Sequence, residues 1–216
     1  MPARDSASGS VDFMVGIGQS QNYRCDSGCR PSGGLCERCA PGNGFDYEKG
    51  VNFSTLITRE HAESVRSHIE SGLSQGARLI CGGTRFEDPS LSPGNFVPAT
   101  ILADVTPDMR VFREEIFGPV GCVTPFGTEE EALRLANATG YGLAGGVFSR
   151  DCARAHRVAS GIRAGQVYIN SYFSKGMMES PGTGWKESGI GVAGIHKYMH
   201  SRTVFMSLED APQPPI

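Results

Sequence analysis

A carboxylate and an aromatic ring stand two positions apart in the segment REEIFGP, residues 113–119. The carboxylate of Glu115 can accept hydrogen bonds from the hydroxyls of a ribose, and the ring of Phe117 can pack against a flat heterocycle. An exposed acidic turn would have the same composition, so the residue types by themselves leave both interpretations open. This segment is the first candidate for a binding site.

A second candidate is the segment SPGTGWKESGIG, residues 180–191. Five of its twelve residues are glycine or proline, and it holds the single tryptophan of the chain, Trp185. A backbone of this kind suits a loop at a binding site, but it equally suits a long surface loop that Trp185 anchors by packing. The residues alone do not choose between the two.

Four cysteines close to the N-terminus raise the question of zinc. Cys25, Cys29, Cys36 and Cys39 lie within fifteen residues and could supply four thiolates. Structural zinc sites usually separate two tight pairs by roughly 12 to 20 residues, whereas six residues separate the pairs here. Reduced thiols in a poorly ordered arm are therefore the favoured interpretation, a small zinc-binding regulator stays an alternative, and no metal ligand is assigned.

The remaining histidines and cysteines give weaker signals. His61 and His68 are seven residues apart and are expected on the solvated outer side of one helix, and His196 and His200 are expected on another exposed face. An odd total of seven cysteines argues against a disulfide framework. Three scattered cysteines beside apolar neighbours are expected to be small buried residues: Cys81, Cys122 and Cys152.

Composition limits the partner classes. The 216 residues include 39% apolar side chains, enough for one large domain or a domain and a half. A formal charge of −3 provides no basic surface for nucleic acid. No run of 18 apolar residues and no signal-peptide pattern occurs, so we expect neither membrane insertion nor secretion, and a cytoplasmic protein.

The elements that must position the candidate residues begin near residue 41. Residues 1–40 show no sustained period of 2 or 3.6 and are rich in Ser, Gly, Arg and Cys, so we expect a poorly ordered arm. From Pro41 on, helical spacing alternates with short apolar runs that end at glycines. This alternation is typical of α/β folds.

Capping residues and apolar spacing predict three helices. Thr58 can cap the first, which Gly76 can end. Thr128 and Glu131 have the spacing of a capping box at the start of the second, and Asp151 can cap the third. The positions expected to face the core are Ala62, Val65, Ile69 and Leu73, then Ala132, Leu135 and Ala136, and finally Ala155, Val158, Ala159 and Ile162.

Apolar runs predict strands between and after these helices. Two successive strand-helix-strand units predict a mostly parallel sheet flanked by helices. Gly165 stands where a left-handed residue would end the third helix. The segment 193–200 predicts a short helix, and residues 202–208 predict an apolar strand outside the main sheet. The other strands are expected at 79–81, 96–102, 120–125, 145–149 and 166–170.

Several motifs together resemble the aldehyde dehydrogenase superfamily, in order and at compatible spacing. The resemblance covers about three quarters of the chain and extends upstream through CGG at 81–83 and the helix 60–76, and more faintly to Gly42 and Asn43. One departure is Pro181, which replaces the first aromatic residue of the family's F-G-G-x-K-x-S-G-x-G segment. The four motifs are EEIFGPV at 114–120, YGLAGGVFSRD at 141–151, AGQVYIN at 164–170 and PGTGWKESGIG at 181–191.

The resemblance implies a fold, an activity and two site residues. Residues 41–200 would be part of the family's α/β catalytic domain, and 201–216 its terminal oligomerisation strand and tail. Members oxidise an aldehyde to a carboxylic acid with NAD or NADP, through a cysteine thiolate and a glutamate base. By motif position, Glu115 corresponds to the carboxylate that binds the nicotinamide ribose, and Phe117 to the ring beside the nicotinamide.

The family's nucleophile does not carry over to this sequence. It belongs to a G-Q-x-C motif upstream of the four motifs above, and the only comparable text in that part of the sequence is GQSQ at residues 18–21, where Gln21 replaces the cysteine. The general base, the oxyanion asparagine and the Rossmann half would precede residue 1, so no catalytic residue is assigned. We therefore expect a truncated, catalytically impaired member that binds NAD or NADP weakly. The alternative is a non-catalytic subunit or remnant that associates with a full-length relative. The resemblance also leads us to expect a homo- or hetero-oligomer.

Overall fold

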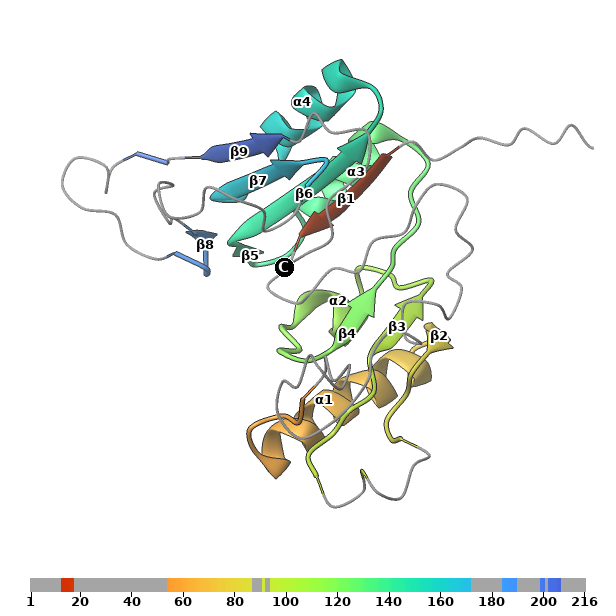
Figure 1. Cartoon of the computed structure of the whole chain (residues 1–216). Coiled ribbons are helices and arrows are strands. Elements are labelled where there is room, and N and C mark those ends of the chain that lie inside the picture. Colours follow the sequence, from red (N-terminus) through yellow and green to blue (C-terminus); the bar gives the residue numbers. More distant parts are fainter. Residues whose placement is uncertain are drawn as a thin grey trace, which may run out of the picture.

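The described residues form two groups of elements, which lie in the upper and lower parts of Figure 1. A computed structural model of the chain describes residues 13–17, 54–86, 91, 94–171, 184–189, 199–200 and 202–206. The lower group contains α1 (Arg59–Ser74), β2 (Arg78–Cys81), β3 (Thr100–Ala103), α2 (Arg110–Arg113) and β4 (Val120–Cys122). The upper group contains β1 (Phe13–Ile17), α3 (Glu129–Ala136), β5 (Tyr141–Gly142), β6 (Ala144–Ser149), α4 (Cys152–Gly161), β7 (Gln166–Ile169), β8 (Trp185–Lys186) and β9 (Thr203–Met206).

The lower group packs α1 and α2 with a three-stranded sheet. Strand β3 is central, antiparallel to β2 and parallel to β4. All four residues of β3 are buried, as expected for a strand that is covered by other elements. Ile69, Leu102, Val111 and Val120 belong to the core of this group.

Helix α1 begins and ends as its sequence predicts. The Thr58 hydroxyl accepts a hydrogen bond from the backbone nitrogen of His61 at 3.1 Å, and Gly76 follows the helix with φ +102°. Ala62, Val65 and Ile69 are fully buried. The fourth expected core position is wrong, because Leu73 is 37% exposed, and Gly72 is buried in its place.

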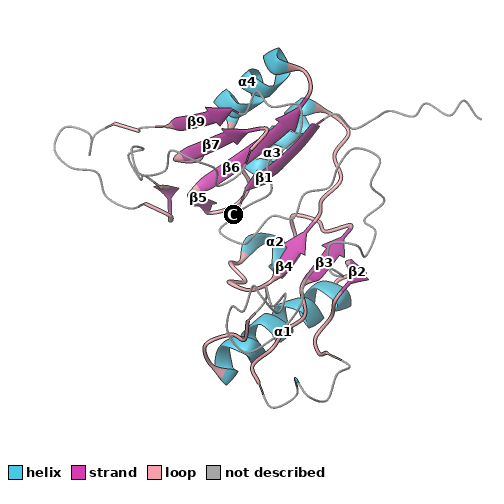
Figure 2. Cartoon of the chain, in the orientation of Figure 1, coloured by secondary structure: helices cyan, strands magenta, loops and turns pink. Residues whose placement is uncertain are grey.

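The upper group is built on a four-stranded sheet in the order β1-β6-β7-β9. Strands β6 and β7 are parallel, and α4 connects them. Helices α3 and α4 lie on the same side of this sheet (Figures 1 and 2). The α/β class predicted from the sequence is therefore confirmed.

The caps of the upper helices also follow the sequence, with one exception. The Thr128 side chain accepts from the backbone nitrogen of Glu131, and that of Asp151 accepts from Arg154. The predicted left-handed end of α4 is wrong. The helix ends at Gly161, and the cap residue Ile162 is extended at φ −73° and ψ 127°, so the turn to β7 needs no left-handed glycine.

Strand β9 corrects the expected position of the C-terminal strand. It pairs in parallel with β7, from Gln166 opposite Thr203 to Ile169 opposite Met206, and so belongs to the main sheet. The expectation that it lies outside that sheet is wrong, because a partner strand is available within the same chain. In the described part of the molecule β9 is an edge of this sheet.

Strand β1 lies within residues 1–40, where the sequence predicts no regular element. It pairs antiparallel with β6, from Phe13 opposite Ser149 to Ile17 opposite Gly145. Long-range pairing, rather than local periodicity, therefore forms this strand. The rest of the arm and most of the predicted helix 193–200 lie outside the described residues. In the described ranges, no helix is both long and apolar enough to span a bilayer.

Candidate nucleotide-binding loop

The first candidate segment forms a loop between α2 and β4, residues 114–119. Two of its neighbouring side chains differ in exposure, one buried in the core and one directed to solvent. Ile116 is 6% exposed and belongs to the core of the lower group, whereas Phe117 is 66% exposed. Phe117 has φ +55°, a left-handed conformation that is unfavourable for a residue with a side chain. The loop therefore presents an aromatic ring to solvent at the cost of local strain.

Packing and backbone hydrogen bonds place the loop on α1 and β3. A Cβ atom at Gly118 would lie only 2.6 Å from Val65 Cγ2, so the backbone approaches the helix more closely than any other residue would allow. The backbone nitrogen of Thr100 donates to the carbonyl of Pro119 at 2.8 Å. The end of the loop is thereby joined to the sheet.

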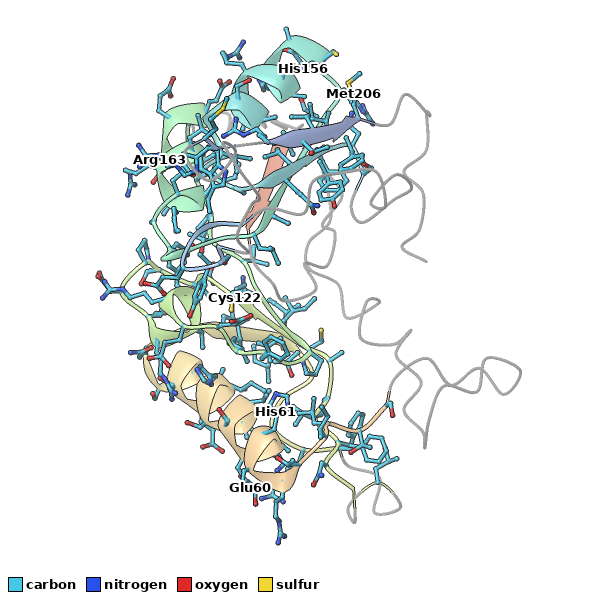
Figure 3. All side chains as sticks on the ribbon, turned by 90° about the vertical axis from the view of Figure 1, so that its left-hand side faces the viewer. Glu60, His61, Cys122, His156, Arg163 and Met206 are labelled. Atoms are coloured by element: carbon cyan, nitrogen blue, oxygen red, sulfur yellow. The ribbon has the colours of Figure 1, made fainter. Side chains whose placement is uncertain are left out.

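Two histidines of α1 contact the loop, which corrects the expectation that both lie on a solvated face. His61 Nε2 lies 2.7 Å from the carbonyl oxygen of Phe117, and the two rings are 6.3 Å apart. His68 is 4% exposed, with Nδ1 2.8 Å from the carbonyl of Ser64 and Nε2 3.2 Å from Glu114 Oε2. Glu60 and His61 project from different sides of the start of α1 (Figure 3).

Glu114 is held from α2 as well as from α1. Arg110 Nε donates to Glu114 Oε2 at 2.7 Å, and its Nη1 donates to the hydroxyl of Ser67 on α1. The Arg110 hydrogen bond, assisted by His68, lowers the pKa of Glu114 below its usual value. Glu114 therefore serves as a structural anchor that holds the start of the loop on α1 and α2.

Glu115 has the properties expected of a hydroxyl acceptor. Its side chain is half-buried, and burial raises its pKa above the usual value. A partly desolvated carboxylate gains more from hydrogen bonds to ligand hydroxyls than one surrounded by water, because fewer water contacts must be replaced. The structure thus places the two predicted residues, Glu115 and Phe117, in one loop with complementary properties.

None of the described cysteines has the properties of a nucleophile beside this loop. Cys122 on β4 is partly buried, its Sγ lies 3.6 Å from the carbonyl of Val111, and burial raises its pKa to about 12. Cys152 is exposed rather than buried as expected, and it begins α4 in the upper group. Cys81 is disulfide-bonded, so the expectation of a simple buried thiol there is wrong.

The second candidate segment is described over residues 184–189, where β8 pairs with β5. Lys186 Nζ donates to the carbonyls of Asn137 and Thr139, at 3.0 and 2.8 Å, and so joins this segment to the end of α3. Burial, followed by the charge of Arg163, lowers the pKa of Lys186. The lysine is thus used in holding the segment.

Trp185 packs against residues near the C-terminus. Its ring centroid lies 4.8 Å from that of His200, and the guanidinium of Arg202 lies 5.1 Å from the ring centroid. Arg202 also donates to backbone carbonyls at the end of α4. These contacts favour the interpretation of Trp185 as a packing anchor.

No cluster of three or more potential metal ligands occurs within the part of the chain that the structure describes. The four cysteines proposed for zinc, between Cys25 and Cys39, lie outside that part. Gln21, which the sequence resemblance compares with a cysteine, also lies outside it. The described site therefore consists of the loop and the elements that hold it.

Comparison with known proteins gives consistent results. The family model described as the aldehyde dehydrogenase family matches residues 36–207. 4-Trimethylaminobutyraldehyde dehydrogenase A of Danio rerio is 45% identical over 168 residues, which are 75% of this chain and 33% of the relative. Betaine aldehyde dehydrogenase of Agrobacterium fabrum is 44% identical over 177 residues, which are 79% of this chain and 35% of the relative.

Solved structures are also similar. One of betaine aldehyde dehydrogenase from Staphylococcus aureus in complex with NAD+ has a TM-score of 0.68 and 38% sequence identity, and covers 73% of this chain and 31% of that protein. The chain thus spans about a third of the length of the curated relatives and solved structures that it matches.

Proposed function

The chain belongs to the aldehyde dehydrogenase family, and we propose that its loop 114–119 binds the nicotinamide end of NAD or NADP. The observation that carries this proposal is the loop itself, with its half-buried Glu115 carboxylate and its outward Phe117 ring. The hydroxyls of a ribose need a hydrogen-bond acceptor, and the flat base attached to that ribose needs an adjacent apolar surface, so the carboxylate and the ring must lie close together. The residues present therefore fit the group.

Each residue has a distinct role in this proposal. Glu115 accepts hydrogen bonds from the ribose hydroxyls, and the ring of Phe117 packs beside the nicotinamide. Phe117 is directed outward because Ile116 is fixed in the core and Gly118 is pressed against Val65. When bound, the nicotinamide dinucleotide supplies the oxidant that accepts a hydride. NAD+ is supported as the cofactor type by its presence in a similar solved structure.

Binding experiments with halves of the cofactor test this role directly. The full chain, labelled with ¹⁵N, is titrated with NAD+, nicotinamide mononucleotide and AMP. We expect shifts in the amide signals of residues 114–118 with the first two ligands and none with AMP, and Phe117→Ala should remove them. Shifts in the loop with AMP, or equal shifts in Phe117→Ala, would contradict the proposal.

We propose weak cofactor affinity for the 216-residue polypeptide. Most dinucleotide affinity normally comes from contacts to adenosine and phosphates. The G-x-G-x-x-G spacing occurs at residues 140–145, where it runs through β5 into β6 rather than from a strand into a helix, and at 189–194, which overlaps the second candidate segment. No Walker motif occurs in the sequence. Calorimetry should show weak NAD+ binding. Micromolar affinity for NAD+ would show that this chain holds the rest of the dinucleotide by residues not identified in the sequence.

We propose that the reaction of this family, oxidation of an aldehyde to a carboxylic acid, is the one to which the site belongs. We also propose that the 216-residue polypeptide is catalytically impaired. Relatives named for betaine aldehyde and 4-trimethylaminobutyraldehyde support small aldehydes with a cationic group as substrates to test. Gln21 has no thiolate to attack an aldehyde. NADH formation from betaine aldehyde should be absent. Activity that thiol alkylation abolishes would contradict this and direct attention to Cys25.

We also propose that residues 41–200 correspond to part of the catalytic domain and that 201–216 contribute to assembly with another copy or a longer relative. Edge position and side-chain exposure of β9 support this, since Val204 and Met206 are 41% and 37% exposed. Size-exclusion chromatography with light scattering should show an oligomer that Phe205→Pro disrupts. A monodisperse monomer, unchanged by Phe205→Pro, would exclude an assembly role for β9.

A further inference from the structure

One side of α1 contacts three residues of the loop, Glu114, Phe117 and Gly118. His61, Val65 and His68 are separated by four and three residues, so they lie on the same side of the helix. His61 contacts the carbonyl of Phe117, and His68 contacts the carboxylate of Glu114. Val65 lies beneath Gly118, as described above. The histidines therefore hold the loop on both sides of Glu115.

Phe117 is the residue of the loop that most needs support. Its left-handed conformation is unfavourable for a residue with a side chain, and little packing restrains a ring that is 66% exposed. Nε2 of His61 lies 2.7 Å from the Phe117 carbonyl oxygen, which can only accept, so the ring must donate from Nε2. This bond fixes the orientation of the peptide group that follows Phe117.

His68 supports the other side of the loop. Its Nε2 faces Glu114, and its Nδ1 faces the carbonyl of Ser64 one turn earlier on α1. The second contact fixes the orientation of the ring. The His68 side chain is 5% exposed, while that of Glu114 is 54% exposed, so the histidine is the fixed partner and the glutamate is drawn to it. Because Glu115 follows Glu114 directly, this contact also limits the position of the Glu115 backbone.

We infer that His61 and His68 are positioning residues of the nicotinamide loop, which shape it for the cofactor before binding. The inference rests on the proposed function of the loop. Neither histidine is required to touch the cofactor. Helix α1 thus provides the rigid support against which Glu115 and Phe117 are presented, and loss of either hydrogen bond should weaken cofactor binding by loosening the loop.

Hydrogen exchange in the full chain tests the positioning role without any ligand. Two backbone amides report on it: that of Thr100 on β3, which donates to the carbonyl of Pro119, and that of Glu114, which donates to the carbonyl of Arg110. In His61→Leu the Thr100 amide should exchange about tenfold faster, since one hydrogen bond is lost, and in His68→Leu the Glu114 amide should do so. His156→Leu, on an exposed face of α4, is the matched control and should leave both amides unchanged.

Conservative variants separate positioning from general stability. Glutamine can donate from its own Nε2 at a similar reach, so His61→Gln should keep the slow exchange of the Thr100 amide that His61→Leu loses. Leucine and glutamine are similar in size, so their difference reports the hydrogen bond. Equal exchange in wild type and His61→Leu, or equal acceleration in His61→Gln and His61→Leu, would overturn the inference.

A titration with nicotinamide mononucleotide distinguishes this inference from the proposed function. Binding to wild type that weakens about tenfold in His61→Leu and recovers in His61→Gln supports both. Accelerated exchange in His61→Leu, without mononucleotide binding to wild type, contradicts the proposed function and supports the loop-positioning role. Binding that stays equal in wild type and His61→Leu overturns the positioning role and leaves the proposed function standing.

Discussion

The ring of Phe205 on β9 stacks on the ring of Tyr168 on β7, with 5.0 Å between the centroids and 14° between the planes. The two residues are also directly opposite each other in the parallel strand pair. Tyr168 is fully buried, and its hydroxyl donates to Gln166 at 3.0 Å. This pair attaches the C-terminal strand to the main sheet of its own chain, whatever its outer edge binds.

Replacing Phe205 with alanine should detach this strand. We expect Phe205→Ala to lower the free energy of unfolding by about 1–3 kcal/mol, because it removes the stacked ring and part of its packing. Urea denaturation of the full chain measures the change. Val204→Thr keeps a β-branched residue at a position that is 41% exposed, so it should stay within about 0.5 kcal/mol of wild type. Equal effects of the two variants would contradict the role of the stacked pair.

Sequence patterning predicted the local features of the fold and missed the long-range ones. The caps at Thr58, Thr128 and Asp151 depend on hydrogen bonds between residues three apart, which the sequence displays directly. Strand β1 and the placement of β9 depend on distant partner strands, which no local period reveals. The sequence therefore predicts whether a segment is a helix or a strand more accurately than it predicts which strands pair with each other.

The candidate site shows the same division. Glu115 and Phe117 were found through a motif within one short segment, and the structure places both in a single loop. The contacts of His61 and His68 join positions 56 and 46 residues apart. The one feature of the sequence that could have indicated these contacts is the position of the two histidines beside the buried residues Ala62, Val65 and Ile69. Because histidine is polar, we expected both on a solvated face, which is wrong.

Gly118→Ala should strain the contact between the loop and α1. The new Cβ would lie 2.6 and 2.8 Å from the two Cγ atoms of Val65, so we expect a loss of about 1–3 kcal/mol of stability. The double variant with Val65→Ala should recover part of it, since the obstructing methyl groups are gone. Chemical denaturation of the four proteins completes the cycle. Gly127→Ala, with 3.7 Å to its nearest neighbour, is the control, and additive effects would exclude a direct contact.

Glu115→Gln should separate stability from binding. Burial raises the folded-state pKa of Glu115, so its ionised form opposes folding above that pKa, and the penalty disappears below the ordinary carboxyl pKa, where both states are protonated. The variant should therefore be more stable than wild type at neutral pH and lose this advantage in acid, while nicotinamide mononucleotide binds about tenfold more weakly. Thermal unfolding from pH 3 to 8 measures the first effect, and titration of the ¹⁵N-labelled chain with nicotinamide mononucleotide measures the second. A pH-independent stability difference would contradict the desolvated carboxylate.

The two free thiols of the described residues should differ strongly in reactivity. Burial raises the pKa of Cys122 to about 12, so at pH 7.5 almost none of it is thiolate, and access is restricted as well. Cys152 is exposed at the start of α4. Peptide mapping after brief treatment with N-ethylmaleimide should therefore show complete labelling of Cys152 and almost none of Cys122, with both labelled in 6 M guanidinium. The variant Cys152→Ser controls for assignment. Fast labelling of Cys122 in the folded chain would show that β4 and the loop before it open readily, which the contacts of that loop with α1 and β3 should prevent.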